Sequence, residues 1–136
     1  MTVAERQTRL IEDFAIIEDR QERLAAVVAH ARRRAPLSAS EKTEANRVPG
    51  CVSAVWVAAS VADGRLQLRY DADSPLVKGL VGLLVGLYDG AFPSEVIATE
   101  PTLLDDLGLL QDLSPTRRNG LAAVRGQIKA LAVRLS

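Results

Sequence analysis

Hydrophobic positions recur at helical spacing over the first 31 residues, in two stripes whose opposite faces are polar. The stripes consist of Leu10, Ile11, Phe14 and Ile17, followed by Leu24, Val27, Val28 and Ala31. This period predicts two amphipathic helices. The second ends in three arginines at positions 32–34, shortly before Pro36. Cations at a helix C-terminus complement the macrodipole, so we interpret this run as a solvated helix end rather than a binding patch.

The middle of the chain changes to the period of a β-strand. Residues 52–59 form a β-branched run, and 66–70 alternate between apolar and polar side chains. Between them, Asp63-Gly64 is a strong hairpin signal. The pattern predicts an antiparallel pair of strands, one face of which needs a helical cover. Residues 36–50 before the pair are polar and rich in turn formers, which predicts a loop with a helical turn at 42–45.

Helices are predicted for the remainder. Ser74-Pro75 and Ser114-Pro115 each combine an N-cap residue with a first-turn proline. The predicted helices are 76–88, which is apolar on nearly every side and should be central, two short pieces at 93–98 and 102–107, and a last helix from 115 to about 133. Helices, a strand hairpin and more helices give an α+β fold, a small antiparallel β-sheet with helices packed on one face. The 136 residues fit one domain, 1–136.

Composition narrows the function classes. Acidic and basic residues are equal in number, and only five aromatic side chains are present, which argues against a nucleic-acid partner. The longest apolar run, 80–87, is too short to span a membrane, and no signal peptide is visible. Cys51 is the only cysteine, which excludes an internal disulfide and a multi-cysteine metal site on this chain. We therefore expect a soluble, cytoplasmic protein of a reducing compartment.

Cys51 follows a Pro-Gly turn and begins the β-branched run. A turn gives access to the sulfur and a strand behind it fixes its direction, the setting that a reactive thiol needs. Free cysteines are also among the most buried residue types and often pack as small hydrophobes. The residues alone leave both interpretations open.

Several motifs, in order and in register, resemble those of the SufE-like sulfur acceptor proteins. They are Asn46-Arg47-Val48-Pro49-Gly50-Cys51 with Ser53 and Val55-Trp56, Asp71-Ala72-Asp73 leading into Val77-Lys78-Gly79-Leu80, Leu87-Tyr88-Asp89-Gly90 with Pro93, Leu107-Gly108-Leu109, and Leu113-Ser114-Pro115-Thr116-Arg117-Arg118-Asn119-Gly120-Leu121. The resemblance covers the chain from about residue 10 to its end. It implies a fold like that of the IscU-type scaffold proteins, with the acceptor cysteine on a loop at the sheet edge.

The resemblance also implies an activity. Cys51 matches the cysteine that takes a persulfide sulfur from a cysteine desulfurase, stimulates that enzyme and passes the sulfur to an iron–sulfur cluster scaffold. The pyridoxal phosphate belongs to the desulfurase, and no cofactor or metal is expected on this chain. The protein would be a sulfur-transfer accessory rather than an independent enzyme, and either a monomer or a homodimer. Two departures are Val52, where the family usually has glutamine, and Arg20, where an aromatic residue often stands.

Other residues in these motifs have structural alternatives. Arg117 could stabilise an anionic persulfide or contact the partner, or it could form an ion pair with Asp71 or Asp73. Asp73 is interpreted as a turn or capping residue, and Lys78 as a side chain that reaches outward from an apolar helix, with a partner contact secondary. Ser53 and Trp56 are interpreted as strand and core residues.

Two other functions compete. A cysteine hydrolase needs a base beside the thiol, and His30 is the only histidine, at the end of a predicted helix. An adaptor that activates a desulfurase by binding alone would need no thiol chemistry at all. We further hypothesise that Cys51 folds inward at rest and swings out on docking, since an exposed persulfide loses its sulfur to passing thiols or oxidants.

Overall fold

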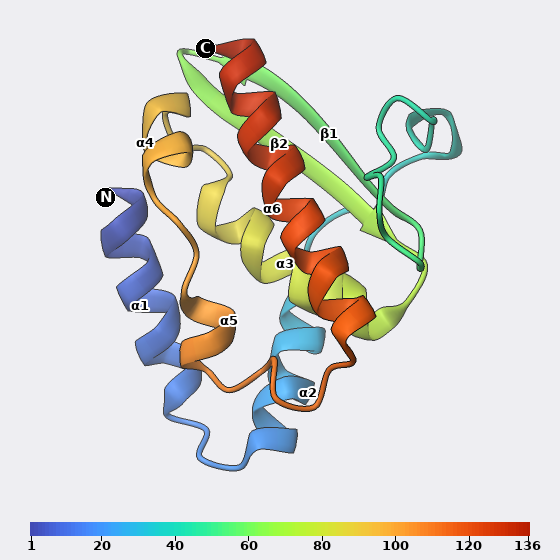
Figure 1. Ribbon diagram of the computed structural model, residues 1–136. Coiled ribbons are helices and arrows are strands. Elements are labelled where there is room, and N and C mark those ends of the chain that lie inside the picture. The colour runs from blue at the N-terminus through green and yellow to red at the C-terminus, as the bar shows by residue number, and fades with distance from the viewer.

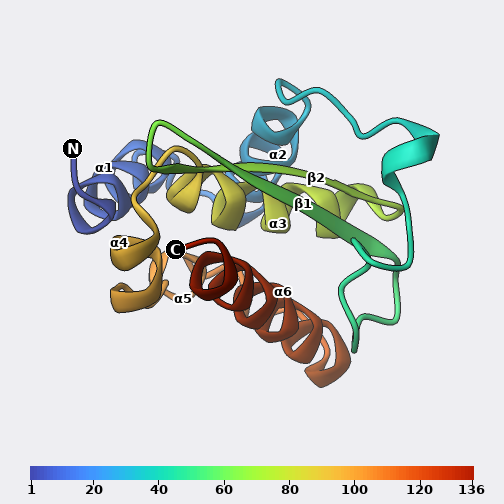
Figure 2. The ribbon, with the colours of Figure 1, turned by 90° about the horizontal axis from the view of Figure 1, so that it is seen from above.

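The computed structural model describes residues 1–136 and contains six α-helices and one two-stranded sheet. In chain order the elements are α1 (Val3–Ala15), α2 (Arg20–Ala31), a short 3-10 helix (Ala39–Glu41), β1 (Val55–Ala62), β2 (Arg65–Ala72), α3 (Pro75–Tyr88), α4 (Pro93–Ala98), α5 (Leu103–Asp106) and α6 (Pro115–Leu135). Figure 1 shows the hairpin behind α6, and Figure 2 shows α3 between α2 and α6. The predicted α+β class is confirmed.

The hairpin forms because the backbone twist of its two-residue turn matches the right-handed twist of the two strands. Asp63 and Gly64 both have positive φ, of 53° and 75°, as a two-residue type I′ turn requires. Pairing therefore continues to the last rung, Ala62 with Arg65, and runs back to Val55 with Ala72. The inward-facing residues of β2 and of the first half of β1 are buried, while β1 becomes exposed toward the hairpin turn. The helices cover one face, as the alternation predicts.

The first strand begins three residues later than predicted, at Val55 instead of Val52. The β-branched run does start at Val52, but strand pairing needs a partner. β2 ends at Ala72, so residues 52–54 have no strand to pair with. The last backbone hydrogen bond between the two segments is donated by the Asp73 amide to the Ala54 carbonyl, at 3.1 Å. Cys51 consequently lies in a loop and does not begin the strand. The helical turn predicted at 42–45 is found about one residue later, where the Arg47 amide donates to the Thr43 carbonyl at 3.0 Å, and a separate 3-10 helix precedes it at 39–41.

The central helix is α3, in which nine of fourteen residues are buried. Its cap is as predicted, because the Ser74 hydroxyl accepts a hydrogen bond from the Val77 amide. Gly79 faces α2 so closely that a Cβ there would lie 2.9 Å from the Val28 backbone, which explains why a helix former is absent. No helix of the protein combines the length and apolar content that crossing a membrane requires.

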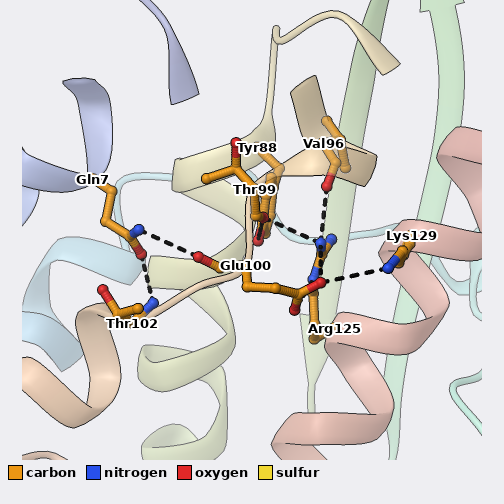
Figure 3. A network of polar contacts seen from close by, with 8 residues as sticks. All are labelled: Gln7, Tyr88, Val96, Thr99, Glu100, Thr102, Arg125 and Lys129. Atoms are coloured by element: carbon orange, nitrogen blue, oxygen red, sulfur yellow. Dashed lines mark hydrogen bonds and ion pairs between the residues drawn. The ribbon is translucent and has the colours of Figure 1, made fainter. Parts of the chain in front are cut away.

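A polar network joins α6 to the segment between α4 and α5 (Figure 3). Arg125 of α6 donates to the carbonyls of Val96 and Thr99 and to the Glu100 carboxylate, and its guanidinium stacks over the Tyr88 ring at 4.7 Å. On the other side of this segment, the Gln7 side chain accepts from the Thr102 amide at 2.7 Å. The buried side chains of Arg125 and Gln7 thus form hydrogen bonds with backbone groups of the segment between α4 and α5.

Candidate functional site

Cys51 lies in a six-residue loop, 49–54, which we call the thiol loop. Both ends of this loop are fixed to the sheet: the Val48 amide donates to the Val55 carbonyl and the Val57 amide to the Asn46 carbonyl, each at 2.8 Å. Gly50 has a φ of +86°, a conformation that side-chain-bearing residues rarely adopt. A closed base and a glycine at the bend hold the thiol loop in a defined position.

The sulfur of Cys51 lies against the first turns of α6. Its Sγ donates to the carbonyl oxygen of Gly120 at 3.4 Å, and a Cβ built on Gly120 would lie 3.6 Å from it. Ser114, whose hydroxyl accepts from the Arg117 amide, caps this helix and sets where it begins. Figure 2 shows the chain before β1 passing beside the start of α6. Ser114 therefore sets where α6 begins, and Gly120, which has no side chain, lets the helix backbone approach the thiol.

Burial dominates the electrostatics of the sulfur. Cys51 is half-buried, and this desolvation raises the pKa of its thiol above the usual value, with Arg47 acting weakly in the other direction. Only the thiolate is a competent nucleophile. The thiol is therefore neutral at neutral pH in this conformation.

A hollow of about 260 Å³, which we call the thiol hollow, opens beside the sulfur. Six of its eleven lining residues are hydrophobic, and the lining consists of Cys51, Val52, Ser53, Val55, Val77, Ser114, Thr116, Arg117, Gly120, Leu121 and Val124. The structure thus brings Ser53 and Arg117 to the thiol. Ser53 belongs to the thiol loop rather than to a strand, which corrects the sequence interpretation.

Arg117 is exposed at the rim of the thiol hollow and forms no ion pair. The alternative that it pairs with Asp71 or Asp73 is therefore wrong. Asp71 is instead paired with two lysines, Lys42 at 3.4 Å and Lys78 at 3.3 Å. A free guanidinium beside the thiol leaves one cation available for an anion or a carboxylate of a partner.

The other predicted site residues lie away from the hollow. Lys78 does not reach outward as predicted, because its ammonium turns to the buried carboxylate of Asp71. Asp73 is an exposed turn residue, and the cap itself is Ser74. Trp56 lies on β1 but on its half-buried outer face, with the Lys42 ammonium 5.2 Å from its ring, so it is not a core residue. Neither Lys78 nor Asp73 contributes to the lining of the thiol hollow.

His30 cannot serve as a base for Cys51. It is exposed on α2, with its ring edge-on to Phe14 at 5.7 Å, and no histidine lines the thiol hollow. A nucleophile–base pair must lie within hydrogen-bond reach, so the arrangement of a cysteine hydrolase is absent. No group of three or more His, Cys, Asp or Glu side chains is placed to hold a metal ion.

Several residues of the hollow were not identified from the sequence. Gly120 and Leu121 follow the predicted N-cap of α6, and Val77 follows that of α3, but nothing local shows that these helix starts meet at Cys51. Two signals were present: all three residues lie in the motifs that carry the family resemblance, and a glycine inside a helical pattern, such as Gly120, often has a packing reason.

Comparison with known proteins identifies the family. The SufE family, described as an Fe-S metabolism associated domain, matches residues 8–132. An uncharacterized SufE-like protein of Synechocystis sp. is 33% identical over 129 residues, which cover 93% of this chain and 81% of the relative. SufE-like protein 1 of Arabidopsis thaliana, named as chloroplastic/mitochondrial, is 35% identical over 82% of this chain but only 30% of its own length.

A longer protein carries a similar segment. Chloroplastic quinolinate synthase of Nicotiana tabacum is 36% identical over 74% of this chain, which corresponds to 14% of that enzyme. Among solved structures, a hypothetical protein from Thermus thermophilus superposes with a TM-score of 0.78 and 24% identity, covering 95% of this chain and 94% of the other. That likeness supports the fold. Matched over most of its length by the family and by a relative of similar extent, the chain belongs to the SufE family, whose domain is associated with iron–sulfur metabolism.

Proposed function

We propose that the protein is a sulfur carrier that takes a persulfide sulfur from a cysteine desulfurase onto Cys51, stimulates that enzyme and delivers the sulfur to a cluster-assembly scaffold. The observation that carries this proposal is the placement of the only thiol, on a loop with a fixed base, against Gly120 and beside a largely apolar hollow. Membership of the SufE family supports it.

The transfer is a thiol–persulfide exchange. The Cys51 thiolate attacks the outer sulfur of the donor's persulfide, a new S–S bond forms, and the bond between that sulfur and the donor's cysteine breaks. The electron pair of the broken bond leaves with the donor's thiolate, which takes up the proton that Cys51 lost. One persulfide and one thiol are present before and after, so no oxidant or reductant is needed.

Shielding is the second part of the proposal. A half-buried thiol with a raised pKa is a poor nucleophile, which protects the resting protein from side reactions. Docking of the donor would draw the thiol loop away from Gly120 and expose the sulfur, and Arg117 would then stabilise the persulfide anion. We further propose that the protein works in a reducing compartment, the cytoplasm, because its function depends on a free thiol.

Mass spectrometry tests the proposal directly. After incubation with a cysteine desulfurase and free cysteine, we expect one added sulfur on Cys51, removable by a thiol reductant. The Cys51→Ser variant should gain none and should not stimulate the desulfurase. Full stimulation by that variant would show instead that the protein is an adaptor that acts by binding alone.

Reaction with a bulky maleimide tests the shielding. We expect Cys51 to react slowly in the free protein and faster in the presence of the desulfurase whose active cysteine has been replaced by serine. Equal rates would contradict an inward resting position.

A further inference from the structure

Val52, the residue after the thiol, is the most exposed large hydrophobic side chain of the molecule. Its exposed fraction is 81%, whereas 28 hydrophobic residues are buried. An isolated exposed valine is ordinary on a protein surface. The position of this one, on the thiol loop and at the edge of the hollow, makes it informative.

We propose that Val52 selects the sulfur donor by docking onto an apolar surface that borders the donor's persulfide cysteine. This inference rests on the function proposed above. Consecutive Cα atoms are about 3.8 Å apart, and the reacting sulfur atoms must approach to about 3.5 Å. A protein that delivers sulfur to Cys51 therefore comes within contact distance of Val52, and we infer that it covers this side chain.

The surroundings of Val52 define the chemistry of the surface that covers it. Val55, Val77 and Leu121 line the same hollow, and Arg117 is its only charged residue. Ser53, Ser114 and Thr116 bring hydroxyl groups to the hollow, but the Val52 side chain itself offers no hydrogen bond, so a polar group placed directly on it would lose its hydration without compensation. An apolar side chain would lose nothing and would remove hydrophobic surface from water. The fitting donor is thus a protein with an apolar residue beside its persulfide, and any carboxylate it offers belongs opposite Arg117.

Kinetics of sulfur transfer from a cysteine desulfurase test this inference, with acceptor concentration as the variable. The variants are Val52→Thr, which keeps the size of the side chain, and Val52→Asp. Matched controls are Val133→Thr and Val133→Asp, because Val133 is 56% exposed and lies thirteen residues after Gly120 on α6, about 20 Å along the helix axis. Glutathione persulfide serves as a second donor that is too small to cover Val52.

For transfer from the desulfurase, we expect Val52→Thr to raise the half-saturating acceptor concentration about threefold and Val52→Asp at least about tenfold, on the scale of one buried valine. The rate at saturation should stay within twofold. Loading of Cys51 from glutathione persulfide should be the same in all variants, and the Val133 variants should match the unsubstituted protein.

Two results would overturn the inference. One is saturation of Val52→Asp at the same concentration as the unsubstituted protein. The other is an equal loss with glutathione persulfide, because that would mean a disturbed thiol loop rather than a lost contact. If Cys51 gains sulfur from neither donor, the proposed function itself fails, whereas normal loading with unaffected Val52 variants removes only the role of Val52.

Discussion

Partial burial disfavours the thiolate form of Cys51, and this has a measurable consequence for its reactivity. Burial raises the pKa of the thiol, so the thiolate fraction at any given pH is lower in the folded protein than in a free cysteine, whose pKa is about 8.5. We expect the rate of alkylation by iodoacetamide to rise with pH around a midpoint above that value. In denaturant the midpoint should return to the ordinary range. A midpoint at or below about 8.5 in the folded protein would contradict the resting state described here.

Asp71 is a second residue whose role follows from its contacts. Its side chain is buried, accepts from the Leu37 and Ala72 amides and pairs with Lys42 and Lys78. Burial alone would raise the pKa of this carboxyl, but the amide of Ala72 and the two lysines outweigh burial and hold the pKa below its usual value. The carboxylate therefore stabilises the fold and tethers the segment before the thiol loop.

Asp71→Asn should lower the free energy of unfolding by about 2 kcal/mol, since it leaves two half-buried lysines without their counter-charge. Urea denaturation measures this. Asp73→Asn is the matched control, because Asp73 is exposed and unpaired, and it should change stability by less than about 0.5 kcal/mol.

The same pair of variants has a pH dependence. The folded-state pKa of Asp71 is lowered, so its contribution is complete above the unfolded carboxyl pKa of about 3.9 and is lost as pH falls through the folded value. The stability difference between the unsubstituted protein and Asp71→Asn should hence shrink below about pH 4. A difference that stays constant down to about pH 2 would assign the effect to shape rather than charge.

Local chemistry made most of the elements predictable from sequence. Ser74-Pro75 and Ser114-Pro115 begin helices where their capping chemistry predicts, and Asp63-Gly64 makes the hairpin turn. The start of β1 was not predictable, because it depends on how far β2 extends on the opposite side. Strand length is a property of a pair, whereas a helix start is a property of four consecutive residues.

The candidate site was predictable only in part, because it too depends on contacts between segments far apart in the sequence. Cys51 and Arg117 are 66 positions apart, and only family resemblance brought them into one proposal before the hollow showed them together. Lys78 was misinterpreted because helical periodicity says nothing about a buried carboxylate on a neighbouring strand. Trp56 was misplaced since alternation gives two faces but does not say which of them is covered.

Gly120 in α6 offers a test at the scale of the element. Alanine is favoured over glycine in a helix by about 1 kcal/mol. A Cβ at Gly120 would meet Cys51 Sγ at an ordinary contact distance of 3.6 Å, and one at Gly126 would meet nothing within 4 Å. We expect Gly120→Ala and Gly126→Ala each to raise the melting temperature by about 3 °C.

Only Gly120→Ala should impair storage of the sulfur, because its methyl group would occupy space beside Cys51 into which a retracted persulfide would fold. The measurement is the rate at which the loaded protein loses its sulfur to a small thiol in the absence of donor, which we expect to rise severalfold for Gly120→Ala and to be unchanged for Gly126→Ala. Equal rates for both variants would mean that the persulfide does not occupy this side of the thiol.

Across the whole molecule, α6 connects two distant parts of the fold. Its first turns meet the thiol loop, and Arg125 in its middle holds the segment between α4 and α5 (Figure 3). Arg125 is buried, and its Nη1 has no hydrogen-bond partner, so Nε and Nη2 make all of its side-chain hydrogen bonds.

Arg125→Met keeps the aliphatic volume but removes every one of those hydrogen bonds. We expect the free energy of unfolding to fall by about 2 kcal/mol, because the Val96 carbonyl loses its side-chain donor, while the Thr99 carbonyl keeps only the Tyr88 hydroxyl and the Glu100 carboxylate keeps only Lys129. Hydrogen exchange should accelerate in residues 96–107. Lys129→Met removes only an exposed pair with Glu100 and should cost less than about 0.5 kcal/mol. Similar losses for both variants would contradict a central role for the buried arginine.

The two hydrogen bonds at the base of the thiol loop, from the Val48 amide to the Val55 carbonyl and from the Val57 amide to the Asn46 carbonyl, have a consequence for timing. Because the two ends of the thiol loop meet there, the six residues between them can rearrange while the sheet stays intact. Short surface segments of this kind relax in nanoseconds to microseconds, whereas enzymes commonly turn over in milliseconds to seconds. If the protein carries sulfur as proposed, we therefore expect loop rearrangement to be faster than turnover, which leaves the rate to the encounter between the two proteins and to the exchange itself.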